Sequence, residues 1–155
     1  MKLAIGNDHA GLEMKRLLIP CLKEQGVEVE DVGTNYPERF PYAISGYRVG
    51  TLVADGAVDG GVLICGTGVG ISLAANKIKG VRACVCSEPV TARLSKLHNN
   101  SNIIAFGARI VGLETAKAIL DAWLHTEFEG GRHQPRIDMI TEIEETGHLE
   151  RAEIE

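Results

Sequence analysis

The chain lacks the features that mark secreted, membrane-spanning or nucleic-acid-binding proteins. None of its apolar runs is long enough to cross a bilayer, and its first residues become acidic at Asp8 before a signal-like apolar region develops. Positive charge is also scarce, because 16 Lys and Arg residues face 21 Asp and Glu residues and leave a formal net charge of −5. This balance disfavours a general binder of nucleic acid or anionic membranes. We therefore expect a cytoplasmic protein with no nucleic-acid or membrane partner.

Paired cysteines are missing as well. Cys21, Cys65, Cys84 and Cys86 show no paired C-x-x-C spacing, so neither a zinc ribbon nor a disulfide framework is indicated. Cys84 and Cys86 alternate along a predicted strand, and Cys21 falls on the apolar side of a predicted helix. Core packing is the better explanation for these three, because free cysteine behaves as a small apolar side chain. Cys65 differs because a glycine-rich segment follows it.

Apolar runs typical of buried strands alternate with segments of helical spacing along the chain. This alternation predicts an α/β fold with a mostly parallel five-stranded sheet that is covered on both faces. We expect one domain over residues 1–145 and a charged tail over 146–155. Pro20 lies within the first predicted helix and is expected to kink or shorten it. The expected strands are 2–6, 27–32, 58–64, 81–86 and 102–106, and the expected helices are 12–25, 42–55, 69–77, 89–98, 113–124 and 135–145.

Polar residues follow the first and third expected strands. Asp8 and His9 come after the first strand, and Cys65 and Thr67 stand at the end of the third. In an open α/β sheet, ligands bind outside the carboxyl ends of the strands, near the point where the strand order reverses. The two groups can therefore meet at one edge of the sheet. His9 alone fits a structural turn as well as a site, and the neighbouring strand favours the site.

A glycine-rich segment follows Cys65 at the end of its apolar run and contains Gly66, Thr67, Gly68 and Gly70. Glycine adopts backbone conformations that other residues avoid, so successive N–H groups can turn inward and form an anion-binding concavity. A thiol beside such a concavity can act as a base or nucleophile whose product anion is already accommodated. The combination favours a chemical site, whereas Cys65 alone would be interpreted as a small buried residue.

Three familiar glycine-loop motifs fit this segment less well. A P-loop needs a lysine followed by serine or threonine after its glycines, and neither stands there. A dinucleotide-binding fingerprint needs a third glycine where Ile71 stands, although Glu88 lies near the position of its ribose-binding acid. A cysteine phosphatase loop needs an arginine where the chain again has Ile71. A thiol beside a small anion-binding loop remains, with nucleotide binding as a weaker alternative.

Positive side chains gather near the last predicted helix and after the last strand. Arg132 and Arg136 flank the predicted helix start, whose free N–H groups also favour an anion. Arg109 follows the last expected strand and could add a further positive group. Phosphate binding explains this pattern better than a solvated basic turn. His98 and Asn99 end a predicted helix, where a histidine can also serve simply by interacting with the last carbonyl groups.

Together these segments resemble one family, the type B ribose-5-phosphate isomerases with the related galactose-6-phosphate isomerase subunits. The resemblance implies a Rossmann-like three-layer α/β/α fold and an obligate dimer, sometimes paired into tetramers, with active sites shared between subunits. It also implies reversible aldose–ketose isomerisation of a phosphorylated sugar through an enediolate, without metal or organic cofactor. The segments that carry the resemblance span nearly the whole chain: 6–11, 61–72, 74–77, 86–89, 98–99, 105–109 and 130–136.

The resemblance also implies a role for each candidate residue. Cys65 matches the base that moves a proton between adjacent carbons, Thr67 assists transfer between the neighbouring oxygens, and His98 is the acid and base of ring opening. The developing oxyanion is stabilised by N–H groups of the loop and by an amide side chain, which belong to Gly66, Gly68, Gly70 and Asn99. The substrate is held at its hydroxyls and its phosphate by Asp8, His9, Arg109, Arg132 and Arg136.

One loop departs from the ribose-type pattern of this family. Arg39 replaces an acidic residue and Phe40 replaces a tyrosine, if Pro41 is the matching proline. Because this loop would contact the sugar, a tetrose, pentose or hexose phosphate could fit. The leading hypothesis is interconversion of ribose 5-phosphate and ribulose 5-phosphate. The alternatives are isomerisation of galactose 6-phosphate, allose 6-phosphate or a tetrose phosphate, and a non-catalytic sugar-phosphate-binding subunit.

Overall fold

The computed structural model of the chain describes residues 1–150. Five strands form a sheet in the order β2-β1-β3-β5-β4, and each strand runs parallel to its neighbours. The predicted five-stranded, mostly parallel sheet is therefore confirmed. The strands are β1 (Lys2–Asn7), β2 (Glu28–Asp31), β3 (Gly60–Cys65), β4 (Ala83–Val85) and β5 (Ile103–Gly107).

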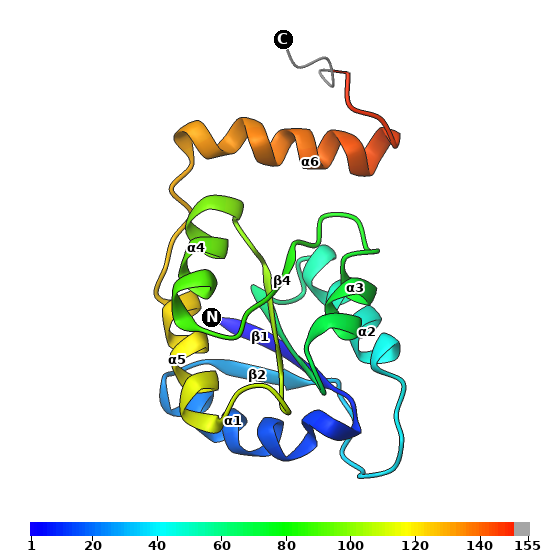
Figure 1. The fold of residues 1–155 in the computed structure, drawn as a ribbon, viewed down its shortest axis with the longest axis vertical. Helices are drawn as coiled ribbons and strands as arrows, with labels where there is room; N and C mark the ends of the chain where they lie inside the picture. Colours follow the sequence, from blue (N-terminus) through cyan, green and yellow to red (C-terminus); the bar gives the residue numbers. More distant parts are fainter. Residues whose placement is uncertain (151–155) are drawn as a thin grey trace.

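Helices cover both faces of this sheet and give the three layers seen in Figure 1. Successive side chains of a strand point to opposite faces, so the central strand β3 contributes to two separate apolar clusters. Ile64 belongs to the first cluster, whereas Leu63 and Cys65 belong to the second. The first face carries α1 (Leu12–Glu24), α4 (Pro89–Asn99) and α5 (Leu113–Leu124), and the second carries α2 (Tyr42–Ala54) and α3 (Val69–Ala75).

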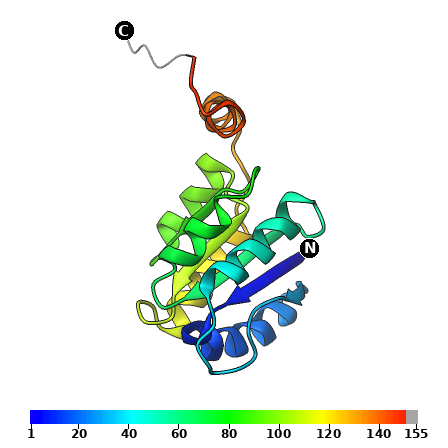
Figure 2. The ribbon, with the colours of Figure 1, turned by 90° about the vertical axis from the view of Figure 1, so that its right-hand side faces the viewer.

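The last helix, α6 (Gln134–Thr146), stands apart from these layers, as the views in Figures 1 and 2 both show. Within α6, all of whose residues are described, Ile137 alone is buried. The Glu144 carboxylate of α6 accepts a hydrogen bond from the Gly80 N–H at 2.8 Å. Ile140 and Ile143 remain 47% and 48% exposed. The helix therefore leaves apolar side chains uncovered in a single copy of the chain.

Several expected boundaries differ from the structure. Pro20 lies inside α1 without ending it, so of its two expected effects, a kink or a shortened helix, the shortening is wrong. The strand expected over 81–86 is reduced to β4. It begins only at Ala83, because the Arg82 N–H donates a hydrogen bond to the Asn102 side-chain oxygen at 2.7 Å. The expected tail over 146–155 lies partly outside the described residues. Among those residues, no helix combines the length and the apolar character needed to cross a bilayer.

A fully buried lysine ties α1 to the segment after β2. The Lys15 ammonium group donates to the Thr34 carbonyl at 2.8 Å and to Asn35 Oδ1 at 2.9 Å, and it pairs with the Asp31 carboxylate at 2.9 Å. These partners satisfy the three donors of the ammonium group, which makes its burial tolerable. The pairing holds residues 31–35 in place beneath the loop that leads to α2.

Candidate functional site

Three loops meet at the carboxyl edge of the sheet, where β1, β3 and β5 end side by side. The loop after β1 is attached to β3, because the Asp8 N–H donates to the Ile64 carbonyl at 3.1 Å. The loop after β5 is attached to the loop after β3, because the Arg109 N–H donates to the Gly66 carbonyl at 3.1 Å. The strand order reverses between β1 and β3, which is where ligands bind in open α/β sheets.

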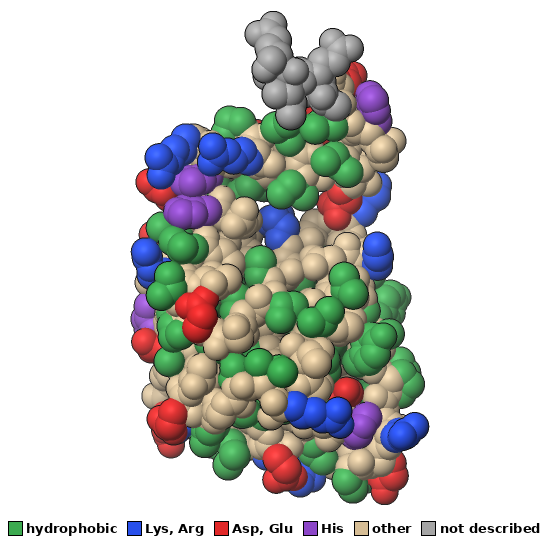
Figure 3. Space-filling model, in the orientation of Figure 1, with side chains coloured by type: hydrophobic (Ala, Val, Ile, Leu, Met, Phe, Trp, Pro, Cys, Tyr) green, Lys and Arg blue, Asp and Glu red, His purple; other side chains and the backbone are tan. Residues whose placement is uncertain are grey.

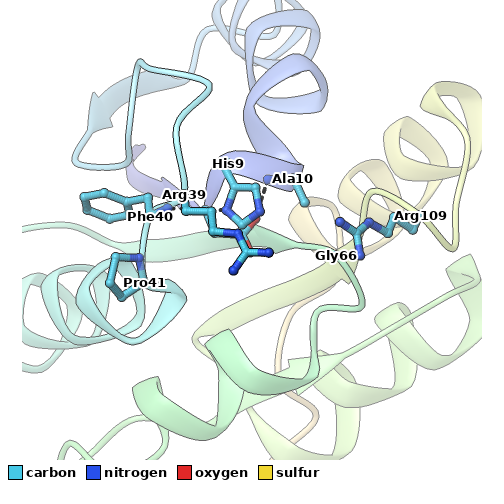
Figure 4. A pocket seen from close by; sticks show the side chains of 8 residues that line it. His9, Ala10, Arg39, Phe40, Pro41, Gly66 and Arg109 are labelled. Atoms are coloured by element: carbon cyan, nitrogen blue, oxygen red, sulfur yellow. Dashed lines mark hydrogen bonds between the residues drawn. The ribbon is translucent and has the colours of Figure 1, made fainter.

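A pocket of about 470 Å³ opens at this edge. Figure 4 shows His9 and Arg39 on one side of it and Arg109 beside Gly66 on the other. The structure therefore brings the residues after the first strand together with the Cys65 loop, and it places positive side chains around the opening. The residues that line the pocket are Asp8, His9, Ala10, Arg39, Phe40, Pro41, Gly66 and Arg109.

Hydrogen bonds orient the two polar residues after β1. Asp8 Oδ1 accepts from the N–H groups of Ala10 and Gly11 at 2.9 and 3.1 Å and so caps the short 3-10 turn η1 (His9–Gly11). The Phe40 N–H donates to His9 Nδ1 at 3.4 Å. A neutral imidazole that accepts at Nδ1 carries its proton on Nε2. His9 therefore keeps a ring donor available for an anion.

The loop that departs from the family pattern forms one wall of the pocket. The Phe40 ring points away from the Arg39 side chain in Figure 4 and lies 6.0 Å from the Arg48 guanidinium carbon, a cation–π distance. Arg39 lines the pocket together with His9 and Arg109. It adds a positive side chain that the resemblance did not imply.

The Cys65 thiol faces the main chain of the glycine-rich loop. Its side chain is 4% exposed, and Sγ accepts a hydrogen bond from the Gly68 N–H at 3.1 Å. Thr67 is exposed, and its hydroxyl oxygen accepts from the Val69 N–H at 3.3 Å. Gly66, next to the thiol, lines the pocket. Cys65 itself does not line the pocket, whereas the glycine-rich loop that its thiol faces reaches the pocket at Gly66. A thiol beside an amide-rich loop that leads into a positively charged pocket fits a base that generates an anion.

Gly68 is required by two independent features of this loop. Its φ is +81°, and a Cβ atom there would lie 2.9 Å from the Phe106 main chain. Gly80 has the same φ with nothing within 4 Å, so it is a matched control for the backbone conformation alone. Gly80→Ala is expected to lower the free energy of unfolding by about 1–2 kcal/mol. Gly68→Ala is expected to lower it by roughly 1–3 kcal/mol more, the usual cost of overpacking.

Urea unfolding of the two glycine variants beside the parent protein measures this difference. Equal losses would show that the close approach to β5 imposes no additional requirement for glycine.

The remaining cysteines have surroundings unlike those of Cys65. Cys86 is buried in the first apolar cluster with Cys84 packed against it, as predicted. Burial raises the pKa of the Cys86 thiol to about 12 and also raises the pKa of Cys84, so both stay protonated near neutral pH. Cys21 is only half-buried and donates to the Leu17 carbonyl at 3.3 Å, so core packing describes it poorly.

A second group of predicted residues lies at the opposite edge of the sheet. α4 follows the carboxyl end of β4 and leads to the amino end of β5, so His98 and Asn99 in its last turn lie at the amino edge. β3 and β5 pair from Gly61↔Ile103 to Cys65↔Gly107, which separates the two edges by roughly 13 Å. Within one copy of the chain, His98 therefore does not meet Cys65.

The two predicted arginines lie near this second group. Arg132 belongs to the short 3-10 turn η2 (Gly131–His133), and Arg136 lies in the first turn of α6. Figure 3 shows Lys, Arg and His side chains gathered in two places on this face, over the beginning of α6 and, at the opposite end, near the loop before α2. The predicted site residues thus fall into two groups at opposite edges of the sheet. The group at the carboxyl edge, here called the thiol half-site, contains Asp8, His9, Cys65, Gly66, Thr67, Gly68, Gly70 and Arg109. The group at the amino edge, here called the arginine half-site, contains His98, Asn99, Arg132 and Arg136.

Sequence reasoning missed two residues beside the arginine half-site, His133 and Glu129. The His98 and His133 rings are stacked, with centroids 4.3 Å apart and planes inclined by 14°, and His133 Nε2 lies 3.1 Å from Glu129 Oε2. Within residues 1–150, these three side chains are the group that could hold a metal ion, because their ligand atoms lie within 4.8 Å of one another. The sequence held a signal for His133, because this histidine stands between the two predicted arginines, Arg132 and Arg136.

Comparison with known proteins identifies the family to which the chain belongs. A family model described as Ribose/Galactose Isomerase matches residues 3–140. A relative from Escherichia coli K12 named ribose-5-phosphate isomerase B is 56% identical over 144 residues, which cover 93% of this chain and 97% of the relative.

Solved structures extend the similarity to three dimensions. Ribose-5-phosphate isomerase B from Clostridium thermocellum superposes with a TM-score of 0.94 at 48% identity and covers 96% of this chain and 100% of its own. The Mycoplasma genitalium enzyme with bound ribulose 5-phosphate has a TM-score of 0.90 at 39% identity, over 94% of this chain and 97% of its own. The Rossmann-like fold implied by the resemblance is confirmed. Matched over most of its length by the family model and by a relative more than half identical to it, the chain belongs to the ribose/galactose isomerase family.

Proposed function

We propose that the chain interconverts ribose 5-phosphate and ribulose 5-phosphate through an enediolate. The observation that carries this proposal is the Cys65 thiol, which faces the Gly68 N–H at 3.1 Å beside a pocket with positive side chains. The 56% identity to a relative named for ribose 5-phosphate supports the choice of sugar.

The chemistry requires a base and an anion-binding loop. A C–H group next to a carbonyl is a weak acid in water, so its removal needs preorganised donors for the oxyanion that forms. Cys65 takes the proton from carbon 2 of the aldose and returns it to carbon 1, while Thr67 helps the proton of the carbon-2 hydroxyl reach the carbon-1 oxygen. The N–H groups of Gly66, Gly68 and Gly70 stabilise the enediolate. Only protons move, so the proposal includes neither a metal nor an organic cofactor.

The phosphate and the ring-opening step involve both half-sites. His9 and Arg109 contribute from the thiol half-site, and Arg132 and Arg136 contribute from the arginine half-site. A phosphate held in this way uses binding energy far from the reacting carbons to hold them against the base. In the proposal, Asp8 binds sugar hydroxyls, His98 opens the sugar ring, and Asn99 helps to hold the enediolate.

A second copy of the chain completes each site in this proposal. Cys65 and His98 lie at opposite edges of the same sheet, so one copy supplies the thiol half-site and another supplies the arginine half-site. The uncovered Ile140 and Ile143 of α6 favour such an assembly, because they could be buried against a partner. We propose a homodimer, or a tetramer of two such dimers. We further propose that it works in the cytoplasm, where charged sugar phosphates are retained because bilayers exclude charge.

A panel of sugar phosphates tests the proposed activity and substrate together. We expect ribose 5-phosphate to give the highest kcat/KM, by roughly tenfold or more over erythrose 4-phosphate, allose 6-phosphate and galactose 6-phosphate. Exchange of the carbon-2 proton with deuterated solvent reports the chemical step directly. A higher kcat/KM for a hexose phosphate would overturn the substrate. Binding of sugar phosphates without proton exchange would show a non-catalytic sugar-phosphate-binding subunit instead.

A further inference from the structure

We propose that His133 is a positioning residue whose ring holds the His98 ring in the orientation that opens the substrate ring. This inference rests on the proposed function, because that proposal assigns ring opening to His98. Ring opening breaks the bond between carbon 1 and the ring oxygen. The anomeric hydroxyl gives up its proton as its oxygen becomes the carbonyl, and the ring oxygen gains a proton. A group that performs both transfers must keep its ring nitrogens aimed at two oxygens.

The His98 ring has little intrinsic orientation of its own. The torsion that turns an imidazole about its Cβ–Cγ bond has broad minima, so the surroundings of the ring decide its direction. His98 is half-buried at the last turn of α4, and the His133 ring covers one of its faces. The near-parallel planes and the 4.3 Å separation restrict rotation of the His98 ring. Removing His133 would leave this face open to water.

His133 is itself held more firmly than the residue it covers. It is 5% exposed, and its Nε2 faces Glu129 Oε2 at 3.1 Å and Arg132 Nε at 3.3 Å. The Glu129 N–H donates to the Leu97 carbonyl at 3.0 Å, so the chain carrying Glu129 is attached to the residue next to His98. A continuous set of contacts therefore runs from α4 through Glu129 and His133 back to His98. Such a closed arrangement suits a support for a reacting group.

The stacked geometry favours support over metal binding. Lone pairs on imidazole nitrogens lie in the ring plane, so two nearly parallel rings direct them side by side instead of toward a common point. A shared ion would require His98 or His133 to leave the stack. His98 is only half-buried in this stack, so part of its ring remains accessible to a substrate.

The decisive comparison uses one sugar that forms a ring and one that cannot. Erythrose 4-phosphate has its carbon-4 oxygen esterified, so it cannot close the furanose ring that ribose 5-phosphate forms. His133→Ala is expected to lower kcat for ribose 5-phosphate by roughly tenfold with KM nearly unchanged. Turnover of erythrose 4-phosphate is expected to change less than about twofold, because its isomerisation needs no ring opening. His133→Phe keeps a flat ring and is expected to restore most of the lost activity.

His125→Ala is the matched control, because His125 is an exposed histidine on the same segment whose ring faces Asp121 instead of His98. Its activity should equal that of the parent chain. Equal slowing of both sugars by His133→Ala, or no slowing of either, would overturn the positioning role.

A double-mutant cycle on ribose 5-phosphate provides a second readout that does not need the tetrose. If His133 acts through His98, adding His133→Ala to His98→Ala should cause little further loss of kcat. Multiplicative losses would overturn the inference. A parent chain that isomerises neither sugar would overturn the proposed function as well, whereas an active parent chain with a fully active His133→Ala variant would overturn the positioning role alone.

Discussion

Cys65→Ala is expected to lower kcat for ribose 5-phosphate by roughly a thousandfold, because it removes the proposed base. Binding of the sugar phosphate should remain close to that of the parent chain, since the phosphate contacts assigned to His9 and the three arginines do not involve sulfur. Cys65→Ser should be almost as inactive, because a hydroxyl can accept the Gly68 hydrogen bond but is a far weaker base near neutral pH. Steady-state kinetics, ligand titration and solvent deuterium exchange together separate these effects.

Cys21→Ala is the appropriate control for the loss of a cysteine. Cys21 is half-buried on α1, donates to its own helix and does not line the pocket. It should have parent-like kcat and KM. Turnover of Cys65→Ala at the parental rate would remove the thiol from the mechanism and with it the main support for the proposed function.

Two inactive variants are expected to recover activity when they assemble together. Cys65→Ala damages the thiol half-site, and the double variant Arg132→Ala/Arg136→Ala damages the arginine half-site. If each site combines one half-site from either copy, random assembly of equal amounts makes about a quarter of the sites intact. Co-expression followed by kcat/KM measurements should therefore give about a quarter of the parental value, far above either variant alone.

The same variants assembled separately and mixed without subunit exchange provide the control for this experiment. They should stay as inactive as the separate proteins. A co-expressed mixture that also stays inactive would mean that each site draws both of its halves from a single copy. The proposal of a shared site would then fail, even if the isomerase activity of the parent chain were established.

Local sequence patterns predicted most of the architecture but not the position of every side chain. The alternation of strands and helices was sufficient for the sheet, and the carboxyl-edge rule was sufficient to bring His9 near the Cys65 loop. Lys15 was not predicted to be buried. The hydrogen-bond partners of its ammonium group are Asp31 and the segment after it, which only the fold brings near. Pro20 was expected to kink or shorten α1, and the helix is not shortened, because it continues through Pro20 to Glu24.

The arginine half-site shows a second limit of sequence reasoning. His133 stands in a polar segment that resembles a solvated turn, yet α4 and Glu129 bury it almost completely. Its environment arises from packing between segments about 35 residues apart, His98 and His133, and no local periodicity reports such a contact. The separation of His98 from Cys65 is likewise a property of sheet topology, since it follows from where α4 ends relative to β5.

The contacts of Lys15 with Asp31 and Thr34 allow one wall of the pocket to vary independently of the rest. Asp31 and Thr34 are held at one end, and Tyr42 begins a helix at the other, so the intervening residues 36–41 are suspended between two fixed supports. Lengthening a flexible loop costs little, about 0.6 kcal/mol for each doubling of its length. Insertions or replacements in this span would reshape the pocket wall that carries Arg39. They would leave the Cys65 thiol and the N–H groups of the glycine-rich loop in their present positions. Natural variation or laboratory evolution could thus alter which sugar is accepted without rebuilding the chemistry.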